Sequence, residues 1–326
     1  MNFIAFWHIL PLALSLDLII GDPEHLPHPV RWMGKAIMHL EPFFRRIISN
    51  AKISGFVFSV TLIFSTWSIT CILLAVLNAK SPVAKDICSV LLIYYSLSAG
   101  SLKKAGMEIY YLLKQKKVDA ARNKVALIVG RDSSTLSKNG IARATVETVA
   151  ENFVDGVISP AFYALIGGAP LAMAYKMVNT LDSMVGYKNR QYKDFGMASA
   201  RIDDVANFIP ARLSVLFISF SAYLICAKGR IALKTASTEG SNHLSPNAGY
   251  PEAAFAGVLG VKLGGPNIYH GQVVSKPYIG KTFGCVFPFH IKQACDLVIL
   301  SSLSGLFFAS GVKILLYYVQ VAFKII

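Results

Sequence analysis

Residues 130–160 read GRDSSTLSKNGIARATVETVAENFVDGVISP, and residues 175–212 read YKMVNTLDSMVGYKNRQYKDFGMASARIDDVANFIPAR. These two stretches are rich in acidic and basic residues, although only 15% of the whole chain is charged. Charged residues within apolar sequence are energetically expensive and usually mark function. The region 130–212 is therefore the central motif block, and long apolar runs flank it on both sides.

The first half of this block predicts a helix that ends at Gly156. Good helix formers fill residues 141–155, and glycine is typical just beyond a helix end. Four charged residues recur at every fourth position and therefore share one helix face. They are Arg143, Glu147, Glu151 and Asp155.

The carboxylates on this face point to a metal site. Near a helix C-terminus each carboxylate costs about 0.3–1 kcal/mol, because the helix dipole is negative there. Mg²⁺ is the usual cation beside phosphates. We therefore predict that Glu147, Glu151 and Asp155 bind Mg²⁺. The alternative is a solvated face with a single Arg143–Glu147 pair.

Composition predicts an all-α, polytopic integral membrane helical bundle, folded as one membrane domain over residues 1–326. Of these 326 residues 54% are hydrophobic, and the mean hydropathy is +0.51. The five cysteines show no CxxC spacing, so neither a disulfide framework nor a cysteine metal cluster is expected. The net charge of +14 is typical of basic loops beside a lipid bilayer, and nucleic acid is not an expected partner.

Between four and six apolar segments are long enough to lie in the bilayer. The segment 157–175 contains Pro160, Gly167, Gly168 and Pro170, and two interpretations compete for it. It either crosses as an ordinary helix or forms a broken, re-entrant pair of half-helices. We favour the broken pair, because interrupted helices are tolerated where they line a cavity.

Lysine and arginine are dense in residues 31–52 and 101–143 and sparse near the N-terminus. The positive-inside rule then places the N-terminus outside the cell membrane and residues 22–52 and 101–156 in the cytoplasm. The first apolar segment lacks a basic region and a cleavage site, so it is expected to stay as an uncleaved span. The polar site should face the cytoplasm, where ATP is available.

A second, loop-rich motif region covers residues 237–282. Its sequence GKT at 280–282 does not form a P-loop, because Ser275 stands where that motif needs glycine. Earlier in the chain, Asp203 or Asp204 is expected to cap the apolar helix 205–227. The loop at residues 21–30 contains His25 and His28, of which His28 is the stronger candidate for a site residue.

Several long blocks together resemble the membrane-embedded adenosylcobinamide-phosphate synthase family of cobalamin biosynthesis. These blocks follow the family's order from Leu16 to Gly280, with two departures: Ser133 where threonine is common, and Glu239 where aspartate is common. They read LDLIIGDPEHLPHPVRWMG, GRD…ARATVETVAENFVDGVISPAFY, NTLDSMVGYKN, ARIDDVANFIPARL, HLSPNAGYPEAA and LGG…YHG.

The resemblance implies an ATP-dependent ligase that joins adenosylcobyric acid, a corrinoid, to an amino-alcohol phosphate such as aminopropanol phosphate or ethanolamine phosphate. It implies ATP as co-substrate, Mg²⁺, an inner-membrane location and other late cobalamin-pathway membrane enzymes as partners. Asp182 or His243 is then the expected proton acceptor. The residues expected to bind phosphate and substrate are Arg131, Lys138, Arg143, Asn179, Arg201, Arg212, Asn247 and His28.

Two other functional classes remain open. A phosphotransferase of the CDP-alcohol type would also use aspartates and Mg²⁺, but its characteristic DG-x2-AR spacing is absent, since Val157 to Pro160 follow Asp155-Gly156. A secondary transporter would also use broken helices, but the sequence has no repeat symmetry. ATP hydrolysis that depends on an amino-alcohol phosphate and a corrinoid separates the three classes.

Overall fold

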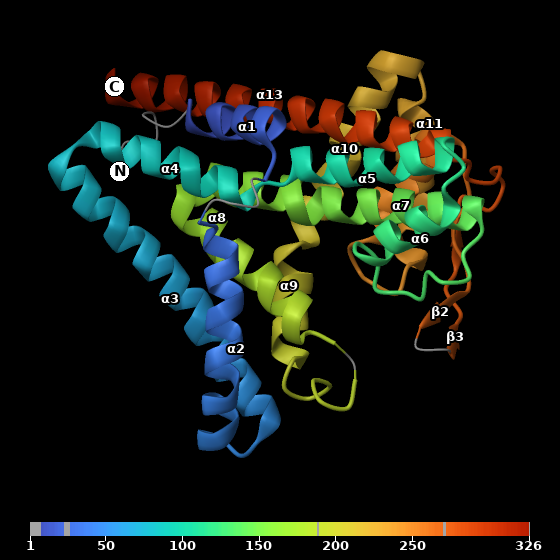
Figure 1. Ribbon diagram of the computed structural model, residues 1–326. Helices are drawn as coiled ribbons and strands as arrows, with labels where there is room; N and C mark the ends of the chain where they lie inside the picture. Colours follow the sequence, from blue (N-terminus) through green and yellow to red (C-terminus); the bar gives the residue numbers. More distant parts are fainter. Residues whose placement is uncertain (1–7, 23–26, 188, 270–271, 326) are drawn as a thin grey trace. The chain divides into compact units, whose positions relative to one another are not determined.

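The computed structural model describes residues 8–22, 27–187, 189–269 and 272–325 (Figure 1). Within them, strands are only two or three residues long, and five helices are long and apolar enough to cross a membrane. The predicted all-α, multi-pass membrane architecture is therefore confirmed. These helices cover Ala51–Lys80, Pro82–Lys114, Lys138–Val185, Phe208–Cys226 and Phe289–Val312.

The chain's contacts group into two compact units. The first unit contains residues 1–98, 159–207 and 306–326. Its helices are α1 (Ile9–Ile20), α2 (Pro29–Ile47), α3 (Ala51–Lys80), α4 (Pro82–Ser96), α8 (Ser159–Val185), α9 (Met197–Ala206) and the end of α13 (Phe289–Ile325).

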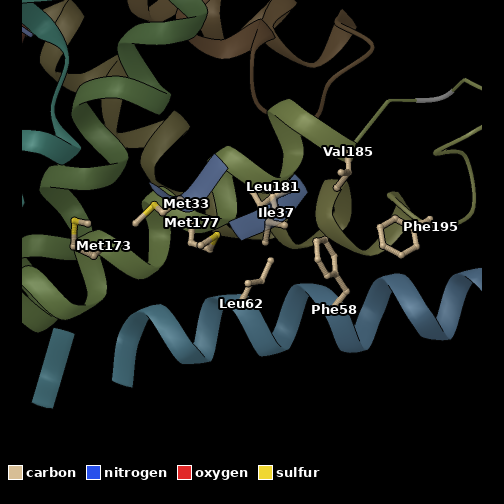
Figure 2. Close-up of a cluster of buried hydrophobic side chains, with 9 residues drawn as sticks. All are labelled: Met33, Ile37, Phe58, Leu62, Met173, Met177, Leu181, Val185 and Phe195. Atoms are coloured by element: carbon tan, nitrogen blue, oxygen red, sulfur yellow. The ribbon is translucent and has the colours of Figure 1, made fainter. Parts of the chain in front are cut away.

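The core of the first unit lies where α2, α3 and α8 meet, with Phe195 at one end (Figure 2). Phe58 and Leu62 project from α3 toward the side chains of α2 and α8. Elsewhere α3 exposes large apolar residues such as Phe64 and Ile72. An apolar surface of this kind on a long helix is suited to contact lipid.

Helix α8 is broken, as the sequence predicts. Gly168 has a φ of 66°, and Gly167 is also non-helical. The rings of Tyr163 and Tyr175, on either side of the break, stack with centroids 5.1 Å apart. In a straight helix these residues would be about 18 Å apart along the axis. The two halves of α8 therefore fold back on each other as a helical hairpin.

Asn207 fastens this hairpin. Its side-chain oxygen accepts hydrogen bonds from the hydroxyls of Ser159, before the break, and Tyr175, after it. Its amide nitrogen donates to the carboxylate of Asp203 at 2.9 Å. Asp203 and Asp204 lie inside α9, which ends at Ala206, and α10 begins only at Phe208. The expectation that one of these aspartates caps the next helix is therefore wrong.

The second unit contains residues 99–158 and 208–305. Helices α5 and α7 lie side by side in it (Figure 1). Helix α12 packs on α7, α10 and α11. Its elements are α5 (Ala99–Lys114), α6 (Val118–Ala126), α7 (Lys138–Phe153), a π-helix (Val154–Ile158), α10 (Phe208–Cys226), α11 (Gly229–Glu239), a 3-10 turn (Gly240–Asn242), α12 (Gly249–Leu259), the first part of α13, and the paired strands β1 (Leu263–Gly264) with β4 (Tyr278–Ile279) and β2 (Asn267–Tyr269) with β3 (Gln272–Val274).

Helix α12 is the most deeply buried element of the second unit, since every residue except the half-buried Tyr250 is shielded from solvent. Small residues make this possible. A methyl group added at Gly257 would stand 2.9 Å from the Cα of Ala232 on α11, so the two helices approach as closely as glycine allows.

The prediction that the acidic helix ends at Gly156 is wrong. The helix continues beyond Phe153 as a π turn and then as α8. Pro160 explains this, because proline has no N–H to offer the carbonyl one turn earlier, and a wider turn accommodates its ring. Glu151 and Asp155 consequently do not lie at a helix end, and the argument from the helix dipole no longer applies to them.

The hairpin in α8 yields a test. We expect Gly168→Ala to lower the free energy of unfolding by about 1–3 kcal/mol, since a φ of 66° with a ψ of −158° strains any residue with a side chain. Chemical denaturation in detergent measures this. Gly311→Ala is the matched control, because a methyl group there meets nothing within 4 Å and α13 gains a better helix former. Equal stability of the two variants would contradict the strained hairpin.

Candidate functional site

The carboxylate of Glu147, deep in α7, is the centre of a buried polar network in the second unit. Ser137 caps the start of α7 by accepting a hydrogen bond from Gly140, and Glu147 follows nearly three turns later. One oxygen of Glu147 accepts from the backbone N–H of Gly264 at 2.7 Å, and the other accepts from the guanidinium of Arg131. Both partners are needed, because a buried carboxylate is costly unless it is paired and hydrogen-bonded.

Asn267 extends this network. Its side-chain oxygen accepts from Arg131 at 2.6 Å and from Arg143 at 3.2 Å, and it is almost fully buried. The sequence analysis did not single out Asn267. The only signal for it was its position two residues after the LGG motif.

The glycine pair in this motif is required by the path of the backbone. Gly264 and Gly265 have φ values of 74° and 85°, which favour glycine. A methyl group at Gly264 would stand 2.3 Å from the carbonyl oxygen of Pro277. A side chain at position 264 would therefore disturb the turn that brings the N–H of Gly264 within hydrogen-bonding distance of Glu147.

A cavity of about 570 Å³, which includes its opening to solvent, lies beside this network. It brings together four of the predicted site residues: Arg131, Glu147, Glu151 and His243. The complete lining is Ile128, Val129, Gly130, Arg131, Glu147, Thr148, Glu151, Asn152, His243, Glu252, Gly264, Asn267 and Lys276.

Glu252 of α12 is another residue of this cavity that the sequence analysis missed. Its side chain is buried, and its carboxylate lies 3.7 Å from Nε2 of His243. Burial raises the pKa of Glu252 well above its usual range, and the charges of Glu147 and Glu151 add to the shift, whereas Lys276 and Arg131 oppose it. This shift favours the protonated form of Glu252, and a nearby positive charge would favour its ionised form.

His243 is held in a defined orientation beside Glu252. Its Nδ1 accepts a hydrogen bond from the backbone N–H of Ser245 at 3.0 Å. Burial lowers the pKa of His243, and the charge of Lys276 lowers it further. A neutral ring whose Nδ1 is an acceptor carries its proton on Nε2, so His243 presents an N–H toward Glu252.

Arg212 and Asn247, two of the predicted residues, form a second cluster in this unit. The guanidinium of Arg212 donates to the side-chain oxygen of Asn247 at 3.3 Å and to the carbonyl of Phe208 at 2.7 Å. It also stacks over the rings of Phe208 and Tyr250. These partners are neutral, so they leave the positive charge of Arg212 available to an anion.

Three other predicted residues of the second unit are outside the cavity lining. Lys138 is exposed at the first position of α7, and Arg143 reaches the network only through Asn267 and Glu147. Asp155 lies on the π turn and does not line the cavity.

Four predicted residues belong to the first unit. His28 caps α2 through its Nδ1, and its Nε2 lies 3.3 Å from Asp22. Burial lowers the pKa of His28, and Arg31 and Lys176 do so as well, while Asp22 opposes them.

The other three are Asn179 and Asp182 on α8 and Arg201 on α9. Asp182 is half-buried and is repelled by the charge of Asp204, and Arg201 is exposed. His25 and His270 lie outside the described residues.

The two residues that depart from the family pattern have structural contacts. The hydroxyl of Ser133 donates to the backbone carbonyl of Arg122 at 3.2 Å. The carboxylate of Glu239 accepts from the N–H of Gly280 at 2.8 Å, where the backbone has a φ of 69°. Glu239 thus stabilises the loop that contains the GKT sequence and lies outside the cavity lining.

The predicted three-carboxylate Mg²⁺ site does not fit this geometry. Glu147 is already paired with Arg131 and Gly264, and within the described part of the chain no three His, Cys, Asp or Glu side chains are placed to hold a metal ion. Mg²⁺ beside phosphates commonly uses only one or two carboxylates. Of the three predicted ligands, Glu151 is the one that both lines the cavity and is exposed.

Comparison with known proteins gives one family. A family model described as CobD/Cbib protein matches residues 10–298. Cobalamin biosynthesis protein CobD of Klebsiella pneumoniae is 45% identical over 305 residues, which cover 93% of this chain and 96% of the relative. CobD of Clostridium perfringens is 46% identical over 270 residues, with 82% and 86% covered, and cobalamin biosynthesis protein CbiB of Salmonella choleraesuis is 47% identical over 272 residues, with 82% and 85% covered. No solved structure matches the chain.

The Glu147 network yields a stability test. We expect Glu147→Gln to lower the free energy of unfolding by about 3 kcal/mol, because it leaves the buried guanidinium of Arg131 without its counter-ion. Denaturation in detergent measures the change. Asp119→Asn is the control, since Asp119 is exposed on α6, outside the candidate membrane spans, and its loss should leave stability unchanged. A Glu147→Gln protein as stable as the wild type would show that Arg131 finds another partner.

Proposed function

Because this chain belongs to the CobD/CbiB family, we propose that it catalyses ATP-dependent amide formation in cobalamin biosynthesis. The acid is the propionate carboxylate of adenosylcobyric acid, and the amine is an amino-alcohol phosphate. The product is adenosylcobinamide phosphate. The relatives carry cobalamin biosynthesis in their names. The observation that supports the chemistry best is one cavity lined by both buried carboxylates and basic side chains.

An amide does not form directly from a carboxylate and an ammonium group, because neither ionised form is reactive. ATP transfers its γ-phosphoryl group to the carboxylate, which gives an acyl phosphate and ADP. The amine, after losing one proton, attacks the acyl carbon, and the carbon–oxygen bond to phosphate breaks as inorganic phosphate leaves. The protein must therefore bind phosphates, hold the amine and accept a proton.

Arginine and lysine side chains supply the phosphate-binding charges in this proposal. Arg131 and Lys276 line the cavity, and Arg212 is stacked on aromatic rings with only neutral hydrogen-bond partners described. Guanidinium groups suit phosphate, since their donors match its oxygens. Lys138, Arg143 and Arg201 remain secondary candidates for the same role.

The polar side chains of Asn247, Asn179 and His28 stay assigned to substrate binding. Asp182 remains a candidate proton acceptor, whereas His243 enters as a donor, because its Nδ1 is already hydrogen-bonded. Mg²⁺ enters as the counter-ion of ATP, with Glu151 as the residue of this chain placed to meet it. The site faces the cytoplasm of the inner membrane, and other late enzymes of the pathway are its expected partners.

The reaction can be tested with the purified full-length protein in detergent. We expect adenosylcobyric acid, ATP, Mg²⁺ and either aminopropanol phosphate or ethanolamine phosphate to give the amide, identified by mass spectrometry, with one ADP per amide. Omission of either organic substrate should abolish ADP release. Phosphoryl or phosphatidyl transfer without amide would favour the phosphotransferase class, and substrate uptake into vesicles without ATP hydrolysis would favour a transporter.

The role of Glu151 yields a separate test. We expect Glu151→Gln to fold normally, because the residue is exposed, and to require a higher Mg²⁺ concentration for half-maximal turnover. Initial rates at a series of Mg²⁺ concentrations measure this. Glu108→Gln, which removes an exposed carboxylate paired with Lys124, is the control. A wild-type rate at low Mg²⁺ would remove Glu151 from the metal's surroundings.

A further inference from the structure

The two most buried carboxylates of the cavity differ in how they are compensated. Glu147 accepts hydrogen bonds from Arg131 and from the N–H of Gly264. Glu252 is just as buried, with 3% of its surface exposed, and its contact with Nε2 of His243 is 3.7 Å long. That distance exceeds a hydrogen bond, whose usual range is about 2.7–3.2 Å. Among the described residues Glu252 is thus a buried carboxyl group with weak compensation for its ionised form, and it lines the cavity.

We infer that Glu252 binds the ammonium group of the amino-alcohol phosphate in this cavity, an inference that rests on the proposed function. A bound ammonium group supplies the positive charge that the carboxylate lacks. It also offsets the repulsion from Glu147 and Glu151, which face the same space. The amine is therefore selected by charge at a position shielded from water, where electrostatic interactions are strong.

The opposite end of the ligand finds cations in the same cavity. Lys276 and Arg131 line it, and the charges of both act on Glu252. Ethanolamine phosphate carries an ammonium group and a phosphate separated by two carbons, so one small zwitterion meets both charges at once. A corrinoid is far larger than this ligand, and we assign the part of the cavity beside Glu252 to the amine substrate.

His243 is a positioning residue in this arrangement. Its Nδ1 is fixed by the N–H of Ser245, and its Nε2–H is directed at the Glu252 carboxylate. The ring lies beside the carboxylate without neutralising it, because a neutral imidazole contributes a dipole and no net charge. The ligand's ammonium group is then the positive charge that completes the site.

Binding of two matched ligands tests the inference. Isothermal titration calorimetry of the full-length protein in detergent compares ethanolamine phosphate with ethyl phosphate, which lacks the amine. We expect Glu252→Gln to weaken ethanolamine phosphate binding about tenfold or more, since a buried charge contact is lost. Ethyl phosphate should bind both proteins within about twofold, because its phosphate contacts are unchanged. Glu252→Asp should recover part of the loss.

Glu108→Gln is the matched control, because it removes a carboxylate of the same unit that lies outside the cavity. Retained ethyl phosphate binding shows that the Glu252→Gln protein is folded. Three results would overturn the inference: equal weakening of both ligands, no weakening of either, or no measurable binding of ethanolamine phosphate to the wild type.

The experiment separates this inference from the proposed function, because binding needs no turnover. Amide synthesis by the wild type together with normal ethanolamine phosphate binding by Glu252→Gln would refute the inference alone. Charge-selective binding that depends on Glu252, in a protein that makes no amide, would refute the proposed reaction and leave the binding site in place.

Discussion

The buried pairing of Glu147 with Arg131 and the N–H of Gly264 is the interaction on which the second unit depends. It joins three segments that are far apart in the sequence: the loop before α7, α7 itself and the turn at β1. A carboxylate at this depth is tolerated only when its partners are in place. The LGG turn and Asn267 follow from that requirement, since one exposes a backbone N–H and the other holds both arginines.

The same requirement explains why the cavity is polar although the chain is not. Helices α7 and α12 are lined with alanine, valine and glycine, which let the backbones approach closely and leave few places for water. Each charged group among them must be satisfied by another residue or by a ligand. Glu147 is satisfied by the protein, whereas the described residues offer Glu252 an imidazole 3.7 Å away, and this contrast is the basis for proposing that Glu252 recognises a ligand.

Much of the fold could be predicted, because hydropathy and helix breakers act locally. Gly167, Gly168 and Pro170 predicted the break in α8, and the structure has it. The prediction that the helix ends at Gly156 was wrong. A glycine after a helical run is a local signal for a helix end, but here the helix continues through the π turn before Pro160. Whether residues 1–326 behave as one domain stays a prediction, as do the orientation in the membrane and the cytoplasmic side of the site.

The site was predicted less completely, because its contacts join distant segments. Spacing along the helix grouped Glu147 with Glu151 and Asp155. The partners of Glu147, however, are Gly264, which is 117 residues away, and Arg131, which precedes the helix. No periodicity reveals such pairs. Glu252 lay within the quoted block HLSPNAGYPEAA, and it is the single acidic residue of the buried helix α12. A lone charge on an otherwise apolar, small-residue helix is a signal that sequence alone could have used.

The way this chain can hold phosphate follows from what it lacks. Because the GKT sequence does not form a P-loop, the proposed phosphate binding rests on charged side chains. Arg131 already donates hydrogen bonds to Glu147 and Asn267. Its contribution to a bound phosphate is therefore positive charge more than hydrogen bonds. Arg212 differs, because carbonyl and amide oxygens and aromatic rings fix its orientation while its charge is left intact. A guanidinium held in place by neutral groups is already oriented for an anion, and the described partners of Arg212 include no carboxylate that the anion would have to displace.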